Sequence, residues 1–206
     1  MLAHVSLRFM PIFVVLSVLC GAPGAVGQTE KTPATYAGQL LVASPRLGDP
    51  RFRKSVIYMV EHNDRGALGL IVNKVYGKGP LAKLMRGYGM DPGNTKGRIT
   101  LHFGGPVSAD GAFILHTGDY KSPRSRPVNR SISFTTDTRI LKDFAAGKGP
   151  RRLLFVLGYA GWSPGQLEEE MARGDWSLSK ADEDRVFGDD KGDVWERIVG
   201  DSEVPL

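Results

Sequence analysis

The stretch from residue 153 to residue 174, LLFVLGYAGWSPGQLEEEMARG, constrains the fold more than any other part of this chain. It opens with an apolar run typical of a buried strand and passes through a glycine-rich turn. A helix-start signal follows. Ser163 stands at the expected N-cap, Pro164 at the first helical position and Gln166 three residues after the serine, which is the pattern of a capping box. The sequence therefore predicts a strand–turn–helix unit here.

Apolar segments in the rest of the chain alternate with turns that are rich in Gly, Pro and Asn. Residues 55–62 and 67–73 flank a turn over residues 63–66, and together they predict a β-hairpin. Further strands are predicted over residues 38–44, 99–103, 112–117, 131–134 and 176–178, and helices over 80–88, 136–146 and 193–199. The chain of 206 residues has no internal repeat and no long linker, so it fits a single α+β domain.

The first 27 residues have the layout of a secretory signal peptide. Arg8 precedes an uncharged apolar segment over residues 9–22, which is shorter than the roughly 20 residues that span a bilayer as a helix. Small residues at Ala25 and Gly27 suit cleavage before the polar residues that follow. We therefore predict export to the periplasm. A retained anchor and a start codon assigned too far upstream are the alternatives.

The predicted organisation is a signal peptide over residues 1–27, a flexible lead-in over 28–37, the folded domain over 38–200 and a C-terminal tail over 201–206. Cys20 is the single cysteine of the chain and falls within the predicted signal peptide. We therefore expect neither an intramolecular disulfide nor a cysteine-based metal site.

The chain carries a formal net charge of +5, and basic residues gather in two segments. They are Lys121, Arg124, Arg126, Arg130, Arg151 and Arg152. Such a patch would suit nucleic acid or acidic lipid. No aromatic platform, helix-turn-helix pattern or zinc spacing accompanies it, so a solvated loop is the favoured interpretation and a nucleic-acid-binding regulator is an alternative.

Histidines at strand ends suggest a second alternative, a hydrolase-type enzyme that uses His62 and His116. Ser55 or Asp119 would then supply a nucleophile or an acid. However, the chain contains no G-x-S-x-G elbow, no H-E-x-x-H pattern and no close pair of histidines for zinc. Structural, hydrogen-bonded histidines are favoured, and no catalytic residue, metal ligand or cofactor is predicted.

A cleft at the ends of neighbouring strands is the candidate binding site, since loops after strands commonly carry sites. Its candidate residues are His62, Asn63, Asn73, Gly104, Gly105, His116 and Trp162. In the alternative interpretation, the asparagines bond the backbone of their own turns and the two glycines permit unusual backbone angles or a close approach.

Three segments resemble the YqgE/AlgH family of bacterial proteins. They are GQLLVASPRLGDPRFRKSVIYMVEHNDRGALGLIVNK, FGGPV and LGYAGWSPGQLEEE, and the resemblance runs from Gly38 to the helix near Trp195. It implies a bent, bifurcated β-sheet that forms a pseudo-barrel flanked by helices. Members of the family have no assigned biochemical role, are proposed to act in transcriptional regulation of alginate production, and generally look cytoplasmic, which is the alternative location for this chain.

We therefore predict a non-enzymatic binding or regulatory protein, with another protein as its candidate partner. The basis is a well-specified fold without a recognisable set of catalytic residues. Export would disfavour nucleic acid as the partner. The sequence specifies no ligand and no oligomeric state.

Overall fold

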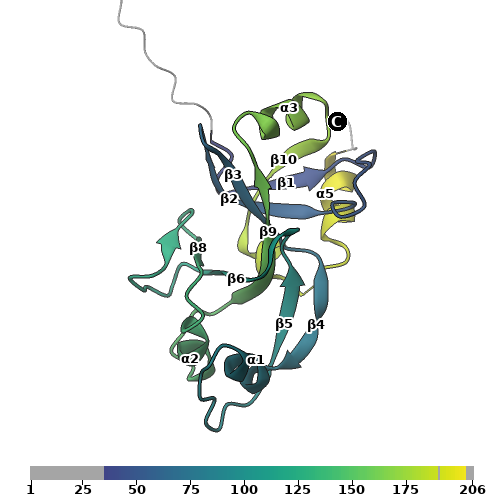
Figure 1. Cartoon of the computed structure of the whole chain (residues 1–206). Coiled ribbons are helices and arrows are strands. Elements are labelled where there is room, and N and C mark those ends of the chain that lie inside the picture. Colours follow the sequence, from purple (N-terminus) through teal and green to yellow (C-terminus); the bar gives the residue numbers. More distant parts are fainter. Residues whose placement is uncertain (1–34, 190, 203–206) are drawn as a thin grey trace, which may run out of the picture. The chain divides into compact units, whose positions relative to one another are not determined.

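The computed structural model describes residues 35–189 and 191–202. The predicted signal peptide and most of the lead-in lie outside these residues. The described part forms one sheet of ten strands with five helices (Figure 1). The strands are β1 (Gln39–Ala43), β2 (Val56–Asn63), β3 (Gly66–Ile71), β4 (Val75–Pro80), β5 (Arg98–Phe103), β6 (Val107–Thr117), β7 (Arg126–Pro127), β8 (Ile132–Thr135), β9 (Leu153–Trp162) and β10 (Trp176–Lys180). The helices are α1 (Leu81–Gly87), α2 (Ile140–Ala145), α3 (Gln166–Ala172), α4 (Glu183–Phe187) and α5 (Val194–Ser202).

The sheet forks at β9. The order of the main path is β10-β1-β2-β3-β9-β6-β8-β7, and β4 and β5 join it through a second pairing of β9. The first half of β9 pairs in parallel with β5, whereas its last three residues pair with β3 in antiparallel fashion. Figure 1 shows the two groups of strands diverging from β9. This confirms the predicted α+β domain with a bent, bifurcated sheet.

Three glycines make the fork possible. A Cβ on Gly104 would lie 2.2 Å from the carbonyl oxygen of Gly158, and a Cβ on Gly105 would lie 2.2 Å from the carbonyl carbon of Tyr159. Gly158 itself has a φ of +73°, a conformation that side chains with a Cβ rarely adopt. The backbone after β5 therefore touches the backbone of β9 at the point where β9 changes partners.

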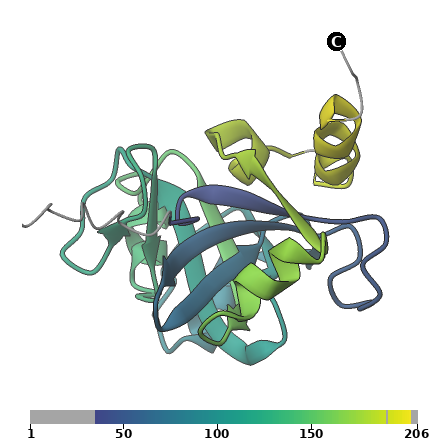
Figure 2. The ribbon, with the colours of Figure 1, turned by 90° about the horizontal axis from the view of Figure 1, so that it is seen from above.

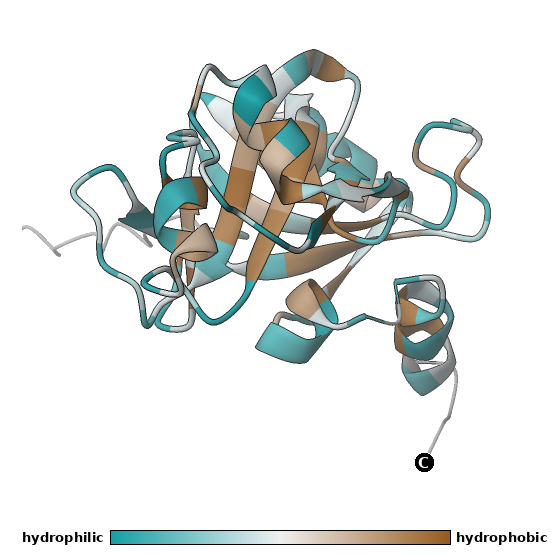
Figure 3. Cartoon of the chain, turned by 90° about the horizontal axis from the view of Figure 1, so that it is seen from below, coloured by the Kyte–Doolittle hydropathy of each residue, from teal (hydrophilic) through white to brown (hydrophobic). Residues whose placement is uncertain are grey.

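Three clusters of buried side chains fill the fold. The first lies between the sheet and the helices α4 and α5, the second beneath α3, and the third beneath α1 and α2. Apolar residues run along the central strands in Figure 3, and Figure 2 shows α3 lying over the β2–β3 hairpin. Leu81, Leu84 and Met85 of α1, and Tyr88 directly after it, all belong to the third cluster, which confirms the predicted helix here.

A half-buried carboxylate clamps α3 to the sheet. The Oε2 atom of Glu170 accepts hydrogen bonds from the indole N–H groups of Trp162 and Trp176, both at 2.8 Å. Its Oε1 atom accepts from the side-chain amide of Gln166 at 2.9 Å. Both tryptophans are buried, so this one side chain joins the end of β9 to the start of β10 and satisfies the N–H groups of two buried rings.

The predicted start of α3 differs from the structure. Helix α3 begins at Gln166, because Pro164 and Gly165 form a turn in which Gly165 has a φ of +77°. The side chain of Ser163 makes no cap hydrogen bond. Only half of the capping box forms, in which the Gln166 amide oxygen accepts from the Ser163 N–H at 3.0 Å. The prediction was wrong because the turn uses the Ser163 carbonyl to bond the Gln166 N–H.

Other local predictions also required correction. Helix α2 starts at Ile140, later than a cap at Thr136 or Asp137 implies, because the Asp137 carboxylate closes a turn onto the Arg139 N–H. Strands β4 and β7 and helix α4 were not predicted. Strand β6 begins at Val107, five residues earlier than expected, and bulges between Val107 and Ala112.

Replacing Glu170 with alanine tests the clamp. Two buried indole N–H groups would lose their acceptor, so Glu170→Ala should lower the free energy of unfolding by about 3 kcal/mol. Glu169→Ala is the matched control on the same helix, because Glu169 is exposed and should cost less than about 0.5 kcal/mol. Urea denaturation measures both, and equal losses in the two variants would refute the clamp.

The fork gives a second prediction about stability. Gly105→Ala should cost more than about 3 kcal/mol or prevent folding, since the new methyl group would overlap the backbone of β9. Gly87→Ala, in an open position at the end of α1, should leave stability unchanged or raise it by about 0.5–1 kcal/mol. Thermal unfolding compares the two, and a Gly105→Ala protein as stable as the parent contradicts the proposed contact.

Candidate functional site

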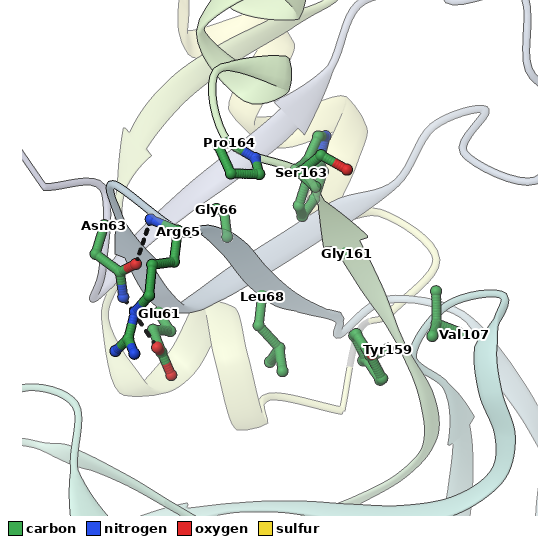
Figure 4. A pocket seen from close by; sticks show the side chains of 12 residues that line it. Glu61, Asn63, Arg65, Gly66, Leu68, Val107, Tyr159, Gly161, Ser163 and Pro164 are labelled. Carbon is green, nitrogen blue, oxygen red and sulfur yellow. Dashed lines mark hydrogen bonds between the residues drawn. The ribbon is translucent and has the colours of Figure 1, made fainter.

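A cleft of about 520 Å³ lies where the β2–β3 hairpin meets the end of β9 (Figure 4). We refer to it as the hairpin cleft. Its lining residues are Glu61, Asn63, Arg65, Gly66, Ala67, Leu68, Val107, Tyr159, Gly161, Trp162, Ser163 and Pro164. The volume falls within the range of known ligand sites. The cleft exists because β3 pairs with β9 over Ala67–Gly69, which sets the hairpin beside the Gly161–Pro164 turn.

One end of the hairpin cleft is polar. Asn63 donates from Nδ2 to the Glu61 carboxylate at 3.0 Å and accepts from the Arg65 N–H at 2.9 Å, so it does hold its own turn. Glu61 is also paired with Arg126 at 3.1 Å. The guanidinium of Arg65 makes no hydrogen bond or ion pair within the described residues. This end therefore offers one positive charge that no carboxylate balances.

The other end of the hairpin cleft is apolar. Leu68 and Tyr159 are half-buried there, and Val107 is 38 % exposed. The ring of Tyr159 packs edge-on against Phe113 with 5.3 Å between the ring centroids, which fixes the orientation of its face. In Figure 4, Leu68 and Tyr159 lie between the Arg65 end and Val107. A binding partner would thus meet an apolar floor next to a cation.

A second groove, of about 340 Å³, lies on the opposite face of the end of β9. It shares Val107, Gly161 and Trp162 with the hairpin cleft and continues past Phe52 and Trp176. Its charges are compensated, because Arg51 pairs with Asp49 at 2.7 Å and Arg173 pairs with Asp175 at 2.8 Å. Its tryptophans are buried, so it offers a partner less free charge and less aromatic surface than the hairpin cleft.

Of the predicted site residues, His62 and Trp162 come together. They flank Ala67 on one face of the sheet, since Ala67 pairs with both. The His62 Nδ1 atom accepts from the Tyr36 N–H at 3.2 Å, so Nε2 carries the proton and donates to Glu168 at 2.7 Å. The helix-end N–H of Glu168 and the hydrogen bond from His62 together lower the pKa of that carboxyl. His62 therefore anchors the start of the domain to α3.

Asn73, Gly104 and Gly105 lie outside the hairpin cleft. The side chain of Asn73 accepts from the Val56 N–H and donates to the Lys54 carbonyl, both at 2.8 Å, which ties the two strands of the hairpin at the end far from its turn. The two glycines form the fork. The glycines thus have the role of the alternative interpretation, whereas Asn73 differs from it, because it bonds the backbone at the start of β2 and not that of its own turn.

His116 lies at the opposite end of β9 from Trp162. It pairs with Leu153, at the start of the strand, whereas Trp162 is the last residue of the strand. The whole length of β9, ten residues and at most roughly 30 Å when extended, lies between the two. His62 and His116 therefore do not share one site, and their pairing in a hydrolase is not assembled. The hydroxyl that does meet His116 belongs to Ser125, which sequence reasoning missed.

Four of the six residues in the basic segments are in ion pairs, and only Lys121 and Arg130 are without one among the described residues. Arg124 pairs with Asp137, Arg126 with Glu61, Arg151 with Asp119 and Glu183, and Arg152 with Asp184. Paired guanidiniums release fewer counterions from a nucleic acid, so this pairing weakens the nucleic-acid alternative. Within residues 35–189 and 191–202, no three His, Cys, Asp or Glu side chains gather as a metal site, and no helix has the length and apolarity to cross a membrane.

Comparison with known proteins places the chain in a family. The model of the AlgH-like family matches residues 40–206. The chain belongs to the AlgH-like family. It is 43 % identical over 173 residues to a UPF0301 protein of Methylococcus capsulatus, an alignment that covers 84 % of this chain and 94 % of the relative. A UPF0301 protein of Afipia carboxidovorans is 39 % identical over 191 residues, which cover 87 % and 90 % of the two chains.

Solved structures agree with this family assignment and confirm the fold. The solution structure of the AlgH protein from Pseudomonas aeruginosa is similar, with a TM-score of 0.71 and 32 % identity, over 86 % of this chain and 94 % of that one. A crystal structure of a Corynebacterium diphtheriae protein has a TM-score of 0.65 at 19 % identity, over 82 % and 87 % of the chains, and shares the fold. The resemblance of the three sequence segments is thereby confirmed.

One further histidine of this AlgH-like chain is buried and has a strongly shifted pKa. His102 of β5 is 3 % exposed, its Nδ1 atom lies 3.3 Å from the Phe155 carbonyl, and its Nε2 atom has no partner. Burial lowers its pKa from 6.5 to about 4, and the charge of the buried Lys191 acts in the same direction. The Lys191 ammonium donates to the Val186 carbonyl, and burial lowers its pKa to about 8. His102 is therefore neutral at neutral pH.

Stability should consequently fall in mild acid. The unfolded chain takes up a proton at His102 below pH 6.5, whereas the folded chain takes it up only near pH 4. The folded state therefore loses about 3 kcal/mol from this group as pH falls across that window. His102→Leu should flatten that part of the stability curve. Urea denaturation at pH 7, 5.5 and 4 measures it, and identical slopes in both proteins would contradict the assignment.

Proposed function

We propose that this protein is a binding or regulatory protein that engages a protein partner through the hairpin cleft, and that this cleft itself catalyses no reaction. The observation that supports this most is the apolar floor of Leu68, Tyr159 and Val107 beside the unbalanced charge of Arg65. Covering exposed apolar surface contributes about 25 cal/mol per Å², so a partner would gain free energy there.

The arrangement of side chains favours binding over catalysis at this site. Ser163 is the hydroxyl at its rim, and no histidine lines the cleft to act as its base. Asn63, Arg65, Ser163 and Pro164 are exposed, so the cleft is open to a large partner and does not exclude water. Arginine and tyrosine next to an apolar patch are typical of the residues that dominate binding energy in protein interfaces.

The regulatory part of the proposal rests on the resemblance to the YqgE/AlgH family, and export to the periplasm is proposed from the N-terminal sequence alone. If residues 1–27 are removed, the partner is a periplasmic or envelope protein. The mature N-terminus, read by mass spectrometry, tests this part: a chain that begins at Gln28 supports it, and a chain that retains Met1 overturns it.

Photo-crosslinking in living cells tests the binding site. A benzophenone side chain at Arg65 or Val107 should capture a partner in a discrete band, whereas the same group at the exposed Lys83 of α1 should not. Val107→Asp with Arg65→Glu should reduce partner recovery at least about tenfold, since interface residues of this kind contribute about 1–2 kcal/mol each.

Matched controls make that result specific. Val75→Asp with Arg86→Glu changes an equally apolar exposed side chain and a second exposed arginine, both remote from the cleft. This control should recover the partner at the parental level, and all variants should melt within a few degrees of the parent. Equal recovery by cleft and control variants removes the hairpin cleft as the binding site.

A further inference from the structure

The opposite end of β9 carries a buried serine–histidine pair. His116 of β6 is fully buried, with its Nδ1 atom 2.9 Å from the Thr117 carbonyl oxygen and its Nε2 atom 2.9 Å from the Ser125 hydroxyl. Ser125 is half-buried, in the loop between β6 and β7. A hydroxyl, an imidazole and an orienting acceptor in a row are the arrangement that activates a nucleophile in many hydrolases.

The hydrogen bonds define the state of the ring. A carbonyl oxygen only accepts, so Nδ1 of His116 carries the proton and donates it to Thr117. Nε2 then presents its lone pair, and the Ser125 hydroxyl donates to it. Burial lowers the pKa of His116 and the charge of Lys121 acts in the same direction, whereas the hydrogen bond to Thr117 and the nearby Asp119 carboxylate oppose that shift. The imidazole is therefore neutral at neutral pH and has a charge close by that favours the imidazolium when it forms.

We propose that Ser125 is a nucleophile activated by His116, and that this pair hydrolyses esters of small acyl groups. The site lies about one length of β9 from the hairpin cleft, so the proposal is independent of the partner binding described above.

A small cavity beside Ser125 limits the acyl group. Its volume is about 70 Å³, well below the roughly 300 Å³ at which sites for larger ligands begin, so it suits only a small acyl group such as acetyl. Arg124 and Arg139 line it, and both pair with Asp137. Asp137 and Asp143 line it as well, so the lining carries no net positive charge, and the guanidinium N–H groups of Arg124 and Arg139 are what would stabilise a developing negative charge on a carbonyl oxygen.

The loop that carries Ser125 is held in place. The Ser125 N–H bonds to the Ser122 carbonyl at 3.0 Å, and the Thr135 hydroxyl donates to the Arg124 carbonyl at 2.8 Å. Tyr120 packs edge-on against His116 and donates to the Asp143 carboxylate at 2.6 Å. The serine and the histidine therefore keep their geometry without a substrate, and preorganised groups of this kind contribute most to a reaction.

The reaction balances with water as the only co-reactant. Ser125 Oγ attacks the ester carbonyl, its proton passes to Nε2 of His116, and the bond between the acyl carbon and the leaving oxygen breaks. The proton then passes from Nε2 to the departing alkoxide, which leaves as an alcohol. Water attacks the acyl-serine, gives its proton to Nε2, and the proton returns to Ser125 as the carboxylic acid leaves.

Hydrolysis of p-nitrophenyl acetate by the purified full-length chain tests the proposal. We expect release of p-nitrophenol above the buffer rate, and a 42 Da increase on the peptide that contains Ser125 when the reaction is stopped early, roughly the mass of one acetyl group. The corresponding octanoate should react at least about tenfold more slowly, because its chain exceeds the cavity. A fluorophosphonate probe should label the same peptide.

Three variants separate chemistry from stability. Ser125→Ala should abolish turnover and labelling while the protein still folds, with a free energy of unfolding about 1–3 kcal/mol below the parent, since it leaves the buried Nε2 of His116 without a donor. His116→Gln should lower the rate about a hundredfold or more, as loss of a general base does. Ser108→Ala, at an exposed serine of the β6 bulge, is the control and should react like the parent.

The pH dependence of the hydrolysis rate tests whether His116 acts as a base, because a histidine with only a structural role would not determine it. Because the pKa of His116 lies below 6.5, the rate of the parent should stay constant from pH 8 down past pH 6.5 before it falls. A parent protein that neither turns over the acetate nor takes up the probe overturns the proposal. So does a Ser125→Ala variant that retains the reaction, or an acetyl group found on another residue.

Discussion

The whole sheet depends on one close contact, in which the backbone of Gly104–Gly105 lies directly against the backbone of β9 at Gly158–Ala160. On one side of this contact β9 pairs with β5 and β6, and on the other side it pairs with β3. A strand has two edges and pairs with one neighbour along each. It can therefore pair with three strands only if one pairing ends where another begins. Glycines leave the space for that exchange, because a methyl group on any of the three would overlap main-chain atoms.

The position of the hairpin cleft follows from the same contact. Once β9 has changed partners, its last residues run beside the β2–β3 hairpin, and α3 must return across them. Glu170 holds that return by accepting both indole N–H groups, which turns Trp162 toward α3 and leaves Tyr159 and Gly161 on the opposite face. The glycines and the tryptophan of the GYAGW segment thus shape the cleft through the fork that they build. The side chains that a partner would contact lie between these residues in the segment, and on the hairpin.

Local patterns in the sequence predicted most elements but little of the candidate site. The hairpin, β9, α1 and α5 follow from periodicity and turn residues, which act over short distances. Strand β4 was missed because Gly77, Gly79 and Pro80 resemble a loop, and only pairing with β5 makes them a strand. Asn63 and Trp162 were identified, whereas Leu68, Tyr159 and Val107 were not. Their exposure depends on the pairing of β9 with β3, which joins Leu68 to Gly161, and with β6, which joins Val107 to Tyr159, and no local pattern encodes either.

The histidines illustrate the same limit in chemical terms. His62 and His116 both end apolar strands and look equivalent in the sequence, yet their surroundings give them different states. Nδ1 of His62 accepts a hydrogen bond from the Tyr36 N–H, and Nε2 donates one to the ionised Glu168. The ring is therefore a structural bridge. His116 donates to a carbonyl and presents a lone pair to Ser125, so it has the form of a base. A histidine becomes a bridge or a base according to which atoms its two nitrogens meet. In this fold that choice is made by the tertiary pairing of β9 at its two ends.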